Sequence, residues 1–377
     1  MKMPRPKNTA VTARVLAALL AISLAGSARG APVTNVLPSV PSLVRSTPTE
    51  FRLGRASGVT TGDTLRLSPE APAANGVRTG TLESAVVMTS APFTELLPSW
   101  NAVTPEGTWV SLEVRAEIGG RWTRYYSYGT WFSWDAPAGG PRRASVDGQS
   151  DADAKVLTDV VRFNRSATRY QYRLRLSSSR AGVSPEVSLV TFTATSPTKV
   201  ATGGAQRAAW GRVLNVPARS QMVFPEGEGW CSPTSVSMVL AYWGHDVTVP
   251  EAARGTYDAQ YEGTGNWAFN AAFAASRGFT AYATRLGGLA DVERHILAGV
   301  PVVMSLGWGA GELPNAPIPK SEGHLIVIVG FDARGNVVVN DPAGRTDAEV
   351  RRVYDRATLE KLWLTHSGGT VYVITRG

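Results

Sequence analysis

A change in hydrophobic periodicity near residue 200 sets the strongest limit on how this chain can fold. From Glu50 to Thr195, apolar and polar residues alternate in short runs such as Trp109–Arg115 and Tyr170–Leu176, separated by Gly, Pro, Asn and Asp. A period of two with frequent turns is typical of antiparallel strands, so we expect an all-β sandwich at 49–195. The later sequence mixes helical spacing with apolar strand-like runs, which predicts an α+β domain at 205–377.

Length and composition agree with two folded domains. The chain has 377 residues, 43% of them hydrophobic and 18% charged, which is typical of a globular protein with more than one core. Residues 196–204 contain Ser-Pro-Thr-Lys and Gly-Gly and are expected to be a linker. Residues 31–48 are rich in Pro and Ser and predict an irregular arm. The segment 205–377 is long enough to support its own core.

The first thirty residues have the features of a secretory signal peptide. A basic leader without acidic residues precedes the apolar run Val15–Ala25, and small residues follow, which predicts cleavage after Ala28 or Gly30. The apolar run is about half the length that a membrane span needs, and no later stretch reaches about 18 uninterrupted apolar residues. We therefore expect a bacterial protein that is secreted, or held in the periplasm or cell envelope, without a membrane span.

Composition also limits the chemistry and the partners of the chain. One cysteine and four histidines exclude a zinc cluster, an iron–sulfur site and an intrachain disulfide, so we expect no cofactor and no metal. Asp147, Asp151 and Asp153 offer oxygen ligands for calcium, but the glycine and terminal glutamate of a helix-loop-helix calcium site are absent, which favours a solvated loop. Basic residues are scattered without a run of five, so nucleic acid is not an expected partner.

The single cysteine, Cys231, needs an explanation in a secreted protein, because an unpaired thiol outside the cell is open to oxidation. It could be a small buried apolar residue. The helical spacing of Val236, Val239, Leu240 and Trp243 instead predicts an amphipathic helix that begins at Cys231 or Ser232. The positive end of a helix favours a thiolate, and the preceding Gly-rich loop leaves the sulfur accessible. These features favour a nucleophile.

A thiolate nucleophile needs a histidine and a third group that orients the histidine. His245 follows the end of the cysteine helix, about 20 Å from its start at 1.5 Å per residue. His295 lies among charged helix residues and is expected on a solvated face, and His366 is expected in a loop of Thr, Ser and Gly. His324 begins an apolar strand, where a histidine standing alone is more often structural, and is the remaining candidate.

The hairpin that follows His324 offers a geometric test. If a four-residue loop follows Phe331, that residue pairs with Asn336, and Asp341 becomes a diagonal neighbour of His324 on the same face, about 7 Å away between backbones. Asn340 would then point away. A three-residue loop would reverse this parity, so the choice between the two residues depends on the loop. Without the other site residues, Asp341 would be interpreted simply as a turn residue.

Four segments together resemble a known family. Gln221, Trp230–Ser235, Gly323–Phe331 and Val338–Pro342 are similar to the papain-like cysteine peptidases of family thirty-nine, relatives of the bacteriocin-processing, double-glycine-leader peptidases. The resemblance covers about 205–377. It implies a papain-like fold and four roles: Cys231 as nucleophile, His324 as general base and acid, Asp341 as orienting group, and Gln221 as side-chain donor to the oxyanion hole.

The predicted function is that of a secreted cysteine peptidase, a thiol hydrolase that cleaves peptide or isopeptide bonds through a Cys-His-Asp triad and an acyl-enzyme intermediate. Its expected partner is a peptide or protein substrate. Alternation predicts that Trp122, Tyr126 and Tyr128 share one strand face in the first domain, where they either pack in the core, the favoured interpretation, or contact an envelope glycan or polymer. The alternative function is a catalytically inactive or amidase-type envelope-binding protein on the same papain-like fold.

Overall fold

The computed structural model describes residues 42–197 and 201–376, all of which fall within one compact unit, Val36–Gly377. The predicted signal peptide lies outside the described residues, as do 198–200 of the predicted linker. Over the two described ranges, no helix has both the length and the apolar character needed to cross a membrane.

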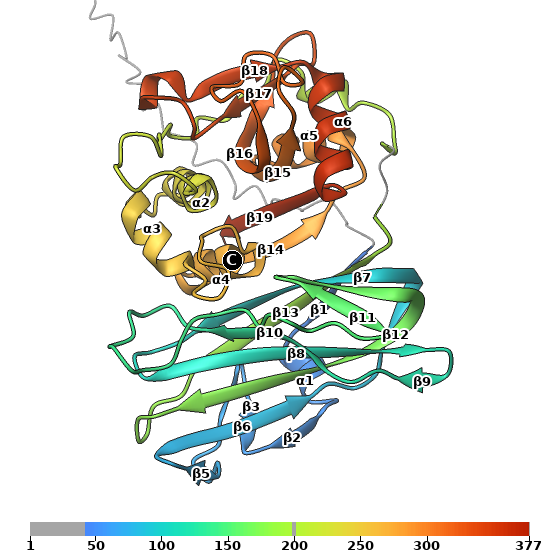
Figure 1. Ribbon diagram of the computed structural model, residues 1–377, viewed down its shortest axis with the longest axis vertical. Helices are drawn as coiled ribbons and strands as arrows, with labels where there is room; N and C mark the ends of the chain where they lie inside the picture. Colours follow the sequence, from blue (N-terminus) through green and yellow to red (C-terminus); the bar gives the residue numbers. More distant parts are fainter. Residues whose placement is uncertain (1–41, 198–200, 377) are drawn as a thin grey trace, which may run out of the picture. The chain divides into compact units, whose positions relative to one another are not determined.

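The first domain consists almost entirely of strands (Figure 1). Its elements are β1 (Leu43–Ser46), α1 (Pro48–Phe51), β2 (Arg55–Ser57), β3 (Val59–Thr61), β4 (Leu65–Leu67), β5 (Ala73–Ala74), β6 (Val77–Glu83), β7 (Val87–Val103), β8 (Thr108–Ile118), β9 (Arg121–Trp122), β10 (Tyr126–Trp131), β11 (Ala154–Leu157), β12 (Val160–Ser178) and β13 (Glu186–Thr195). In the described part of the chain, pairing joins them into one 13-stranded sheet, so the division into a two-sheet sandwich remains a prediction.

The structure corrects the predicted arm and the predicted common strand face of three aromatic residues, and it confirms that two of these residues pack in the core. The predicted irregular arm is partly ordered in a sheet, because β1 pairs with β13 from Leu43 opposite Thr193 onward. Core packing, the favoured interpretation of the aromatic residues, is confirmed for Tyr126 and Tyr128 of β10, which are 0% and 1% exposed. Trp122 lies on β9, where the guanidinium of Arg115 stacks over its ring. These rings pack against side chains of neighbouring strands, so the faces on which a glycan would have to stack are already in contact with the protein.

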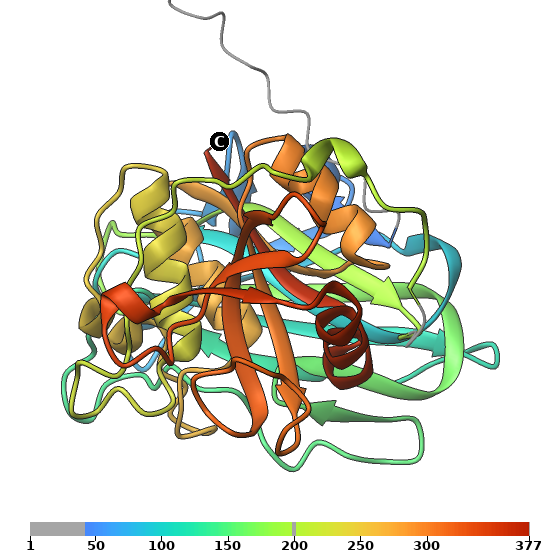
Figure 2. The same cartoon turned by 90° about the horizontal axis from the view of Figure 1, so that it is seen from above.

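The second domain combines a sheet with helices. Its elements are η1 (Arg207–Ala209), α2 (Cys231–Tyr242), α3 (Val249–Thr256), α4 (Trp267–Ser276), β14 (Phe279–Arg285), α5 (Leu289–Leu297), β15 (Val302–Trp308), β16 (Ser321–Phe331), β17 (Val337–Asn340), η2 (Asp347–Glu349), β18 (Arg351–Tyr354), α6 (Arg356–Ser367) and β19 (Thr370–Arg376). The strands lie in the order β14-β19-β15-β16-β17-β18, all antiparallel. Figures 1 and 2 show α2 and α3 on one side of this sheet and α6 on the other.

The helix that begins at Cys231 has the expected start but not the expected character. All residues from Cys231 to Leu240 are buried, so α2 is a core helix rather than an amphipathic one. The face opposite the apolar residues carries Ser and Thr side chains, which are polar. These side chains can be buried because their hydroxyls form hydrogen bonds within the core. Ser237, for example, donates to the Thr234 carbonyl at 2.8 Å.

Two histidines also differ from expectation. His295 is 0% exposed rather than solvated, and its Nδ1 bonds the Asp291 carbonyl at 2.8 Å. His366 lies in helix α6 rather than in a loop. Its Thr and Ser neighbours have low helix propensity, but burial of Leu359, Trp363 and Leu364 against the sheet favours the helix.

The β16–β17 hairpin reaches the expected register by an unexpected route. Phe331 pairs with Val337, so the predicted Phe331–Asn336 pair is wrong and the loop is one residue longer. A register shift between Ile328 and Gly330 then removes the extra residue, as a β-bulge does, and Val327 lies opposite Asn340. At the start of β16 the parity is therefore the predicted one.

The two domains share buried contacts. Ala268, Phe269 and Ala272 of helix α4 belong to the first domain's hydrophobic core, and the Phe269 ring meets Trp100 edge to face at 6.1 Å. Asn101 donates from Nδ2 to the Ala281 carbonyl at 2.6 Å. In a protein of residues 205–377 alone, the Phe269 side chain would be exposed to water. The second domain therefore needs the first domain to complete its hydrophobic packing.

This arrangement predicts that Phe269→Ala destabilises the whole protein. Truncating a buried phenylalanine leaves a cavity, so the free energy of unfolding should fall by about 3–5 kcal/mol. Urea denaturation followed by tryptophan fluorescence and by far-UV circular dichroism should give one coincident transition. The control is Leu53→Ala, because Leu53 is 71% exposed and its truncation should change stability by less than about 0.5 kcal/mol. Two separate transitions, with only one of them shifted, would contradict a shared core.

Candidate active site

Cys231 is the first residue of helix α2 and lines a cleft of about 700 Å³. Its side chain is 8% exposed. No side chain caps this end of the helix, and the first helical hydrogen bond runs from the Thr234 amide to the Trp230 carbonyl at 3.0 Å. The amides of the first turn precede that bond and remain available near the sulfur.

His324 and Asp341 form a buried ion pair. Nε2 of His324 donates to Oδ1 of Asp341 at 2.7 Å, and the two side chains are 3% and 0% exposed. Burial lowers the pKa of His324, but the charge and hydrogen bond of Asp341, with a hydrogen bond to Cys231, outweigh burial and raise this pKa to about 10. The imidazole thus faces the carboxylate with one nitrogen and the thiol with the other.

Two further groups bond the Asp341 carboxylate. The Tyr354 hydroxyl donates to Oδ2 at 2.6 Å, and the Ala343 amide donates to Oδ1 at 3.0 Å. Burial raises the pKa of Asp341, yet the His324 charge and these hydrogen bonds lower it below its usual value. Tyr354 was not among the sequence candidates, because only the pairing of β17 with β18 brings it beside Asp341.

A hydrogen bond connects helix α2, which begins at Cys231, to strand β16, which contains His324. Ser235, one turn after Cys231, donates to the carbonyl of Leu325 at 3.2 Å. On the other side, the Trp308 ring packs edge-on against the His324 ring, with centroids 5.5 Å apart. Ser235 fixes the spacing between thiol and imidazole, and Trp308 shields the ion pair from water.

Gln221 lies next to the end of β17 and is 5% exposed. Its backbone amide donates to the Pro342 carbonyl at 2.9 Å, and its Nε2 donates to the Gly227 carbonyl at 2.9 Å. Oε1 of Gln221 has no hydrogen-bond partner in the described part of the chain. Since a side-chain amide carries two N–H donors, one of them is not used in the contact with Gly227.

Other candidates are placed outside this arrangement, with one exception. Asn340 points away from His324, because its Nδ2 donates to the carbonyls of Val216 and Pro217. His245 is exposed after the end of α2. His366 is the exception: it lines the same cleft as Cys231, and burial lowers its pKa. Sequence reasoning missed it because the helical packing of α6 sets its position.

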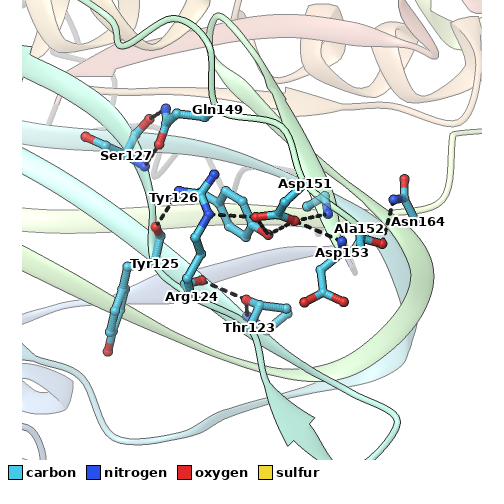
Figure 3. Close-up of polar contacts among 12 residues, drawn as sticks. Thr123, Arg124, Tyr125, Tyr126, Ser127, Gln149, Asp151, Ala152, Asp153 and Asn164 are labelled. Carbon is cyan, nitrogen blue, oxygen red and sulfur yellow. Dashed lines mark hydrogen bonds and ion pairs between the residues drawn. The ribbon is translucent and has the colours of Figure 1, made fainter.

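The acidic loop of the first domain is held by basic and hydroxyl side chains. Arg124 Nε donates to Asp151 Oδ2 at 2.6 Å and the Tyr126 hydroxyl to Oδ1 at 2.7 Å, as Figure 3 shows. Arg121 pairs with Asp153 at 2.6 Å. Asp147 and Asp151 are nevertheless exposed to solvent, as expected for this loop. The described residues contain no group of three His, Cys, Asp or Glu side chains placed to hold a metal ion.

Solved structures with partial likeness include two peptidases and a protein in complex with a galactotriose. A C39-like peptidase from Bacillus anthracis is 18% identical with a TM-score of 0.34, covering 44% of this chain and 98% of its own. A double glycine motif protease from an AMS/PCAT transporter, in complex with the leader peptide, is 17% identical with a TM-score of 0.29, covering 44% and 95%. TmCBM61 in complex with β-1,4-galactotriose is 11% identical with a TM-score of 0.19, covering 40% and 88%.

Family models give the assignment that those structures do not. No curated protein matches the chain. Residues 213–371 match the Peptidase C39 like family, and residues 43–195 match the peptidase C39 N-terminal domain. Together the two matches span the described strands of the first domain and the segment that carries Gln221, Cys231, His324 and Asp341. Residues 213–371 therefore form a domain of the Peptidase C39 like family, and a peptidase C39 N-terminal domain precedes it at 43–195.

Proposed function

We propose that this protein is a secreted cysteine peptidase that cleaves peptide or isopeptide bonds with Cys231 as nucleophile. The observation that carries the proposal is the buried His324–Asp341 pair, which turns the free ring nitrogen of the imidazole toward a thiol at a helix N-terminus. Burying a charged histidine beside a thiol costs free energy. Such a cost is typical of groups that take part in a reaction. The family match supports a peptidase-type activity.

The proposed reaction proceeds in two displacements. The Cys231 sulfur attacks the substrate carbonyl carbon, and the carbonyl electrons move to oxygen. As the carbonyl re-forms, the carbon–nitrogen bond breaks and the imidazolium of His324 protonates the leaving amine. Neutral His324 then removes a proton from water, which attacks the thioester, and release of the acid regenerates the thiolate.

Oxyanion stabilisation is the proposed role of Gln221 and of the Cys231 backbone amide. Gln221 is held by its contacts with Pro342 and Gly227. Its second side-chain N–H is the proposed donor to a substrate oxygen. The Cys231 amide lies at the start of α2, where it has no partner within the helix. Two preorganised donors of this kind bind charge that develops only in the tetrahedral intermediate.

The first prediction for this function concerns thiol reactivity. Iodoacetamide should label Cys231 at pH 6, where an unperturbed thiol is almost wholly protonated, because charged His324 stabilises the thiolate. His324→Ala should move labelling to higher pH, as measured by mass spectrometry across a pH series. His245→Ala is the matched control and should leave the series unchanged. Labelling that begins only above about pH 8 in the unaltered protein would favour an inactive, envelope-binding protein.

A second prediction concerns Tyr354. Tyr354→Phe removes a hydrogen bond to the ionised form of Asp341, so the pKa of Asp341 should rise. The acid limb of kcat/KM, where Asp341 gains a proton and releases His324, should therefore move to higher pH, and unfolding free energy should fall by about 1–3 kcal/mol. Peptide hydrolysis across pH 2–9 measures the limb, because the pKa of Asp341 in the unaltered protein lies below its usual value.

The control for this experiment is Tyr257→Phe, because Tyr257 is 43% exposed and does not contact the ion pair. It should leave the acid limb in place. A Tyr354→Phe protein with reduced stability but an unchanged limb would show that the hydroxyl only supports the fold.

A further inference from the structure

The cleft at Cys231 is not built by the peptidase-like domain alone. Three consecutive residues of the first domain, Leu157, Thr158 and Asp159, line it together with Cys231. Leu157 ends β11, and Thr158 and Asp159 form the turn to β12, which pairs antiparallel with β11. The first domain thus supplies part of the surface that a substrate bound at Cys231 would touch.

This turn has an unusual backbone conformation. Thr158 has a φ of 56°, in the left-handed region, and the Asp159 amide bonds the Leu157 carbonyl at 2.6 Å across it. A β-branched residue is rarely found there, and tight turns of this kind are strained. Strain of this kind persists only where the surrounding structure enforces it, and here it fixes the position of Asp159.

Asp159 is a buried carboxylate without a cationic partner. It is 7% exposed, and its Oδ2 accepts the backbone N–H of Trp267, the first residue of α4. Across the described ranges no basic side chain forms an ion pair with it. Burial raises its pKa to about 7, the Trp267 amide and Arg285 act in the opposite direction, and Asp258 adds to the rise.

The rest of the cleft carries the same sign of charge. Besides Asp159, its lining includes the carboxylates of Glu262 and Glu322 and no Lys or Arg. The chain as a whole has the opposite balance, with 38 Lys and Arg against 30 Asp and Glu. An anionic cleft in a basic protein attracts cationic substrates and disfavours acidic ones.

We propose that the β11–β12 turn of the first domain is a wall of the substrate cleft, and that Asp159 selects substrates that carry a cationic nitrogen near the scissile bond. This inference rests on the proposed peptidase function and names its substrate class: basic peptides. The nitrogen belongs either to a Lys or Arg side chain or to a free α-amino group, since both donate charged N–H groups to a carboxylate. The bound cation supplies the partner that Asp159 lacks within the protein.

Paired peptides test the selection in the full chain. The peptides share one sequence and differ in a single position, Lys or norleucine, and each is made with a free or an acetylated amino terminus. We expect kcat/KM to favour the cationic member by at least tenfold, and Asp159→Asn to reduce this ratio to about one. Asn keeps an acceptor for the Trp267 amide, so the substitution removes charge and not the contact with α4. Retention of the full preference in Asp159→Asn would overturn the proposal.

The matched control is Asp63→Asn, which removes an exposed carboxylate of the first domain that does not line the cleft. Its preference ratio should equal that of the unaltered protein. The two comparisons identify the source of the nitrogen: a Lys-over-norleucine ratio that survives acetylation assigns a side chain, and a free-over-acetylated ratio of at least tenfold within the norleucine pair assigns the α-amino group.

Binding separates this inference from the proposed function. In Cys231→Ala, fluorescence anisotropy of the same labelled peptides should show at least tenfold tighter binding of the cationic member, again dependent on Asp159. If no peptide is cleaved but this charge-selective binding is present, the peptidase proposal fails and the inference stands. If peptides are cleaved through Cys231 without charge preference, the inference fails and the peptidase proposal stands.

Discussion

A buried ion pair is stable only if its surroundings satisfy both charges, and the His324–Asp341 pair depends on several elements for this. Water is excluded from both side chains, so each remaining lone pair of Asp341 must find a donor within the fold. Tyr354 from β18 and the Ala343 amide provide them. The charge state of the His324 imidazole therefore depends on the order of β16, β17 and β18 in the sheet. The thiol of Cys231 meets that imidazole only because α2 is buried against β16.

Sequence reasoning could reach the site because its strongest signals are local. A lone cysteine at a helix start and a histidine at a strand start need no knowledge of distant contacts, and strand parity relates His324 to Asp341. The loop after Phe331 was nevertheless wrong by one residue, and a bulge compensated for it. Bulges leave little trace in an apolar run, so a hairpin register read from loop length alone depends on such chance compensation.

Residues that depend on tertiary neighbours could not be found in this way. Tyr354, Trp308 and Ser235 are ordinary core or helix residues in the sequence, and only the sheet order and the packing of α2 bring them to the pair. Asp159 is separated from Cys231 by a predicted linker and a change of domain. The same limit applies to α4, whose Ala-rich sequence gives no sign that its Phe269 completes another domain's core.

The contact of α4 with the first domain has a consequence for how such proteins can diversify. Phe269 and its two alanine neighbours require a matching apolar surface, and the Asn101 side chain requires the backbone of β14 at a fixed place. A recombination event that exchanged the first domain for an unrelated module would leave both requirements unmet. It would also remove one wall of the cleft. The two halves of the gene are therefore constrained to be inherited together, and changes at their interface must occur as compensating pairs.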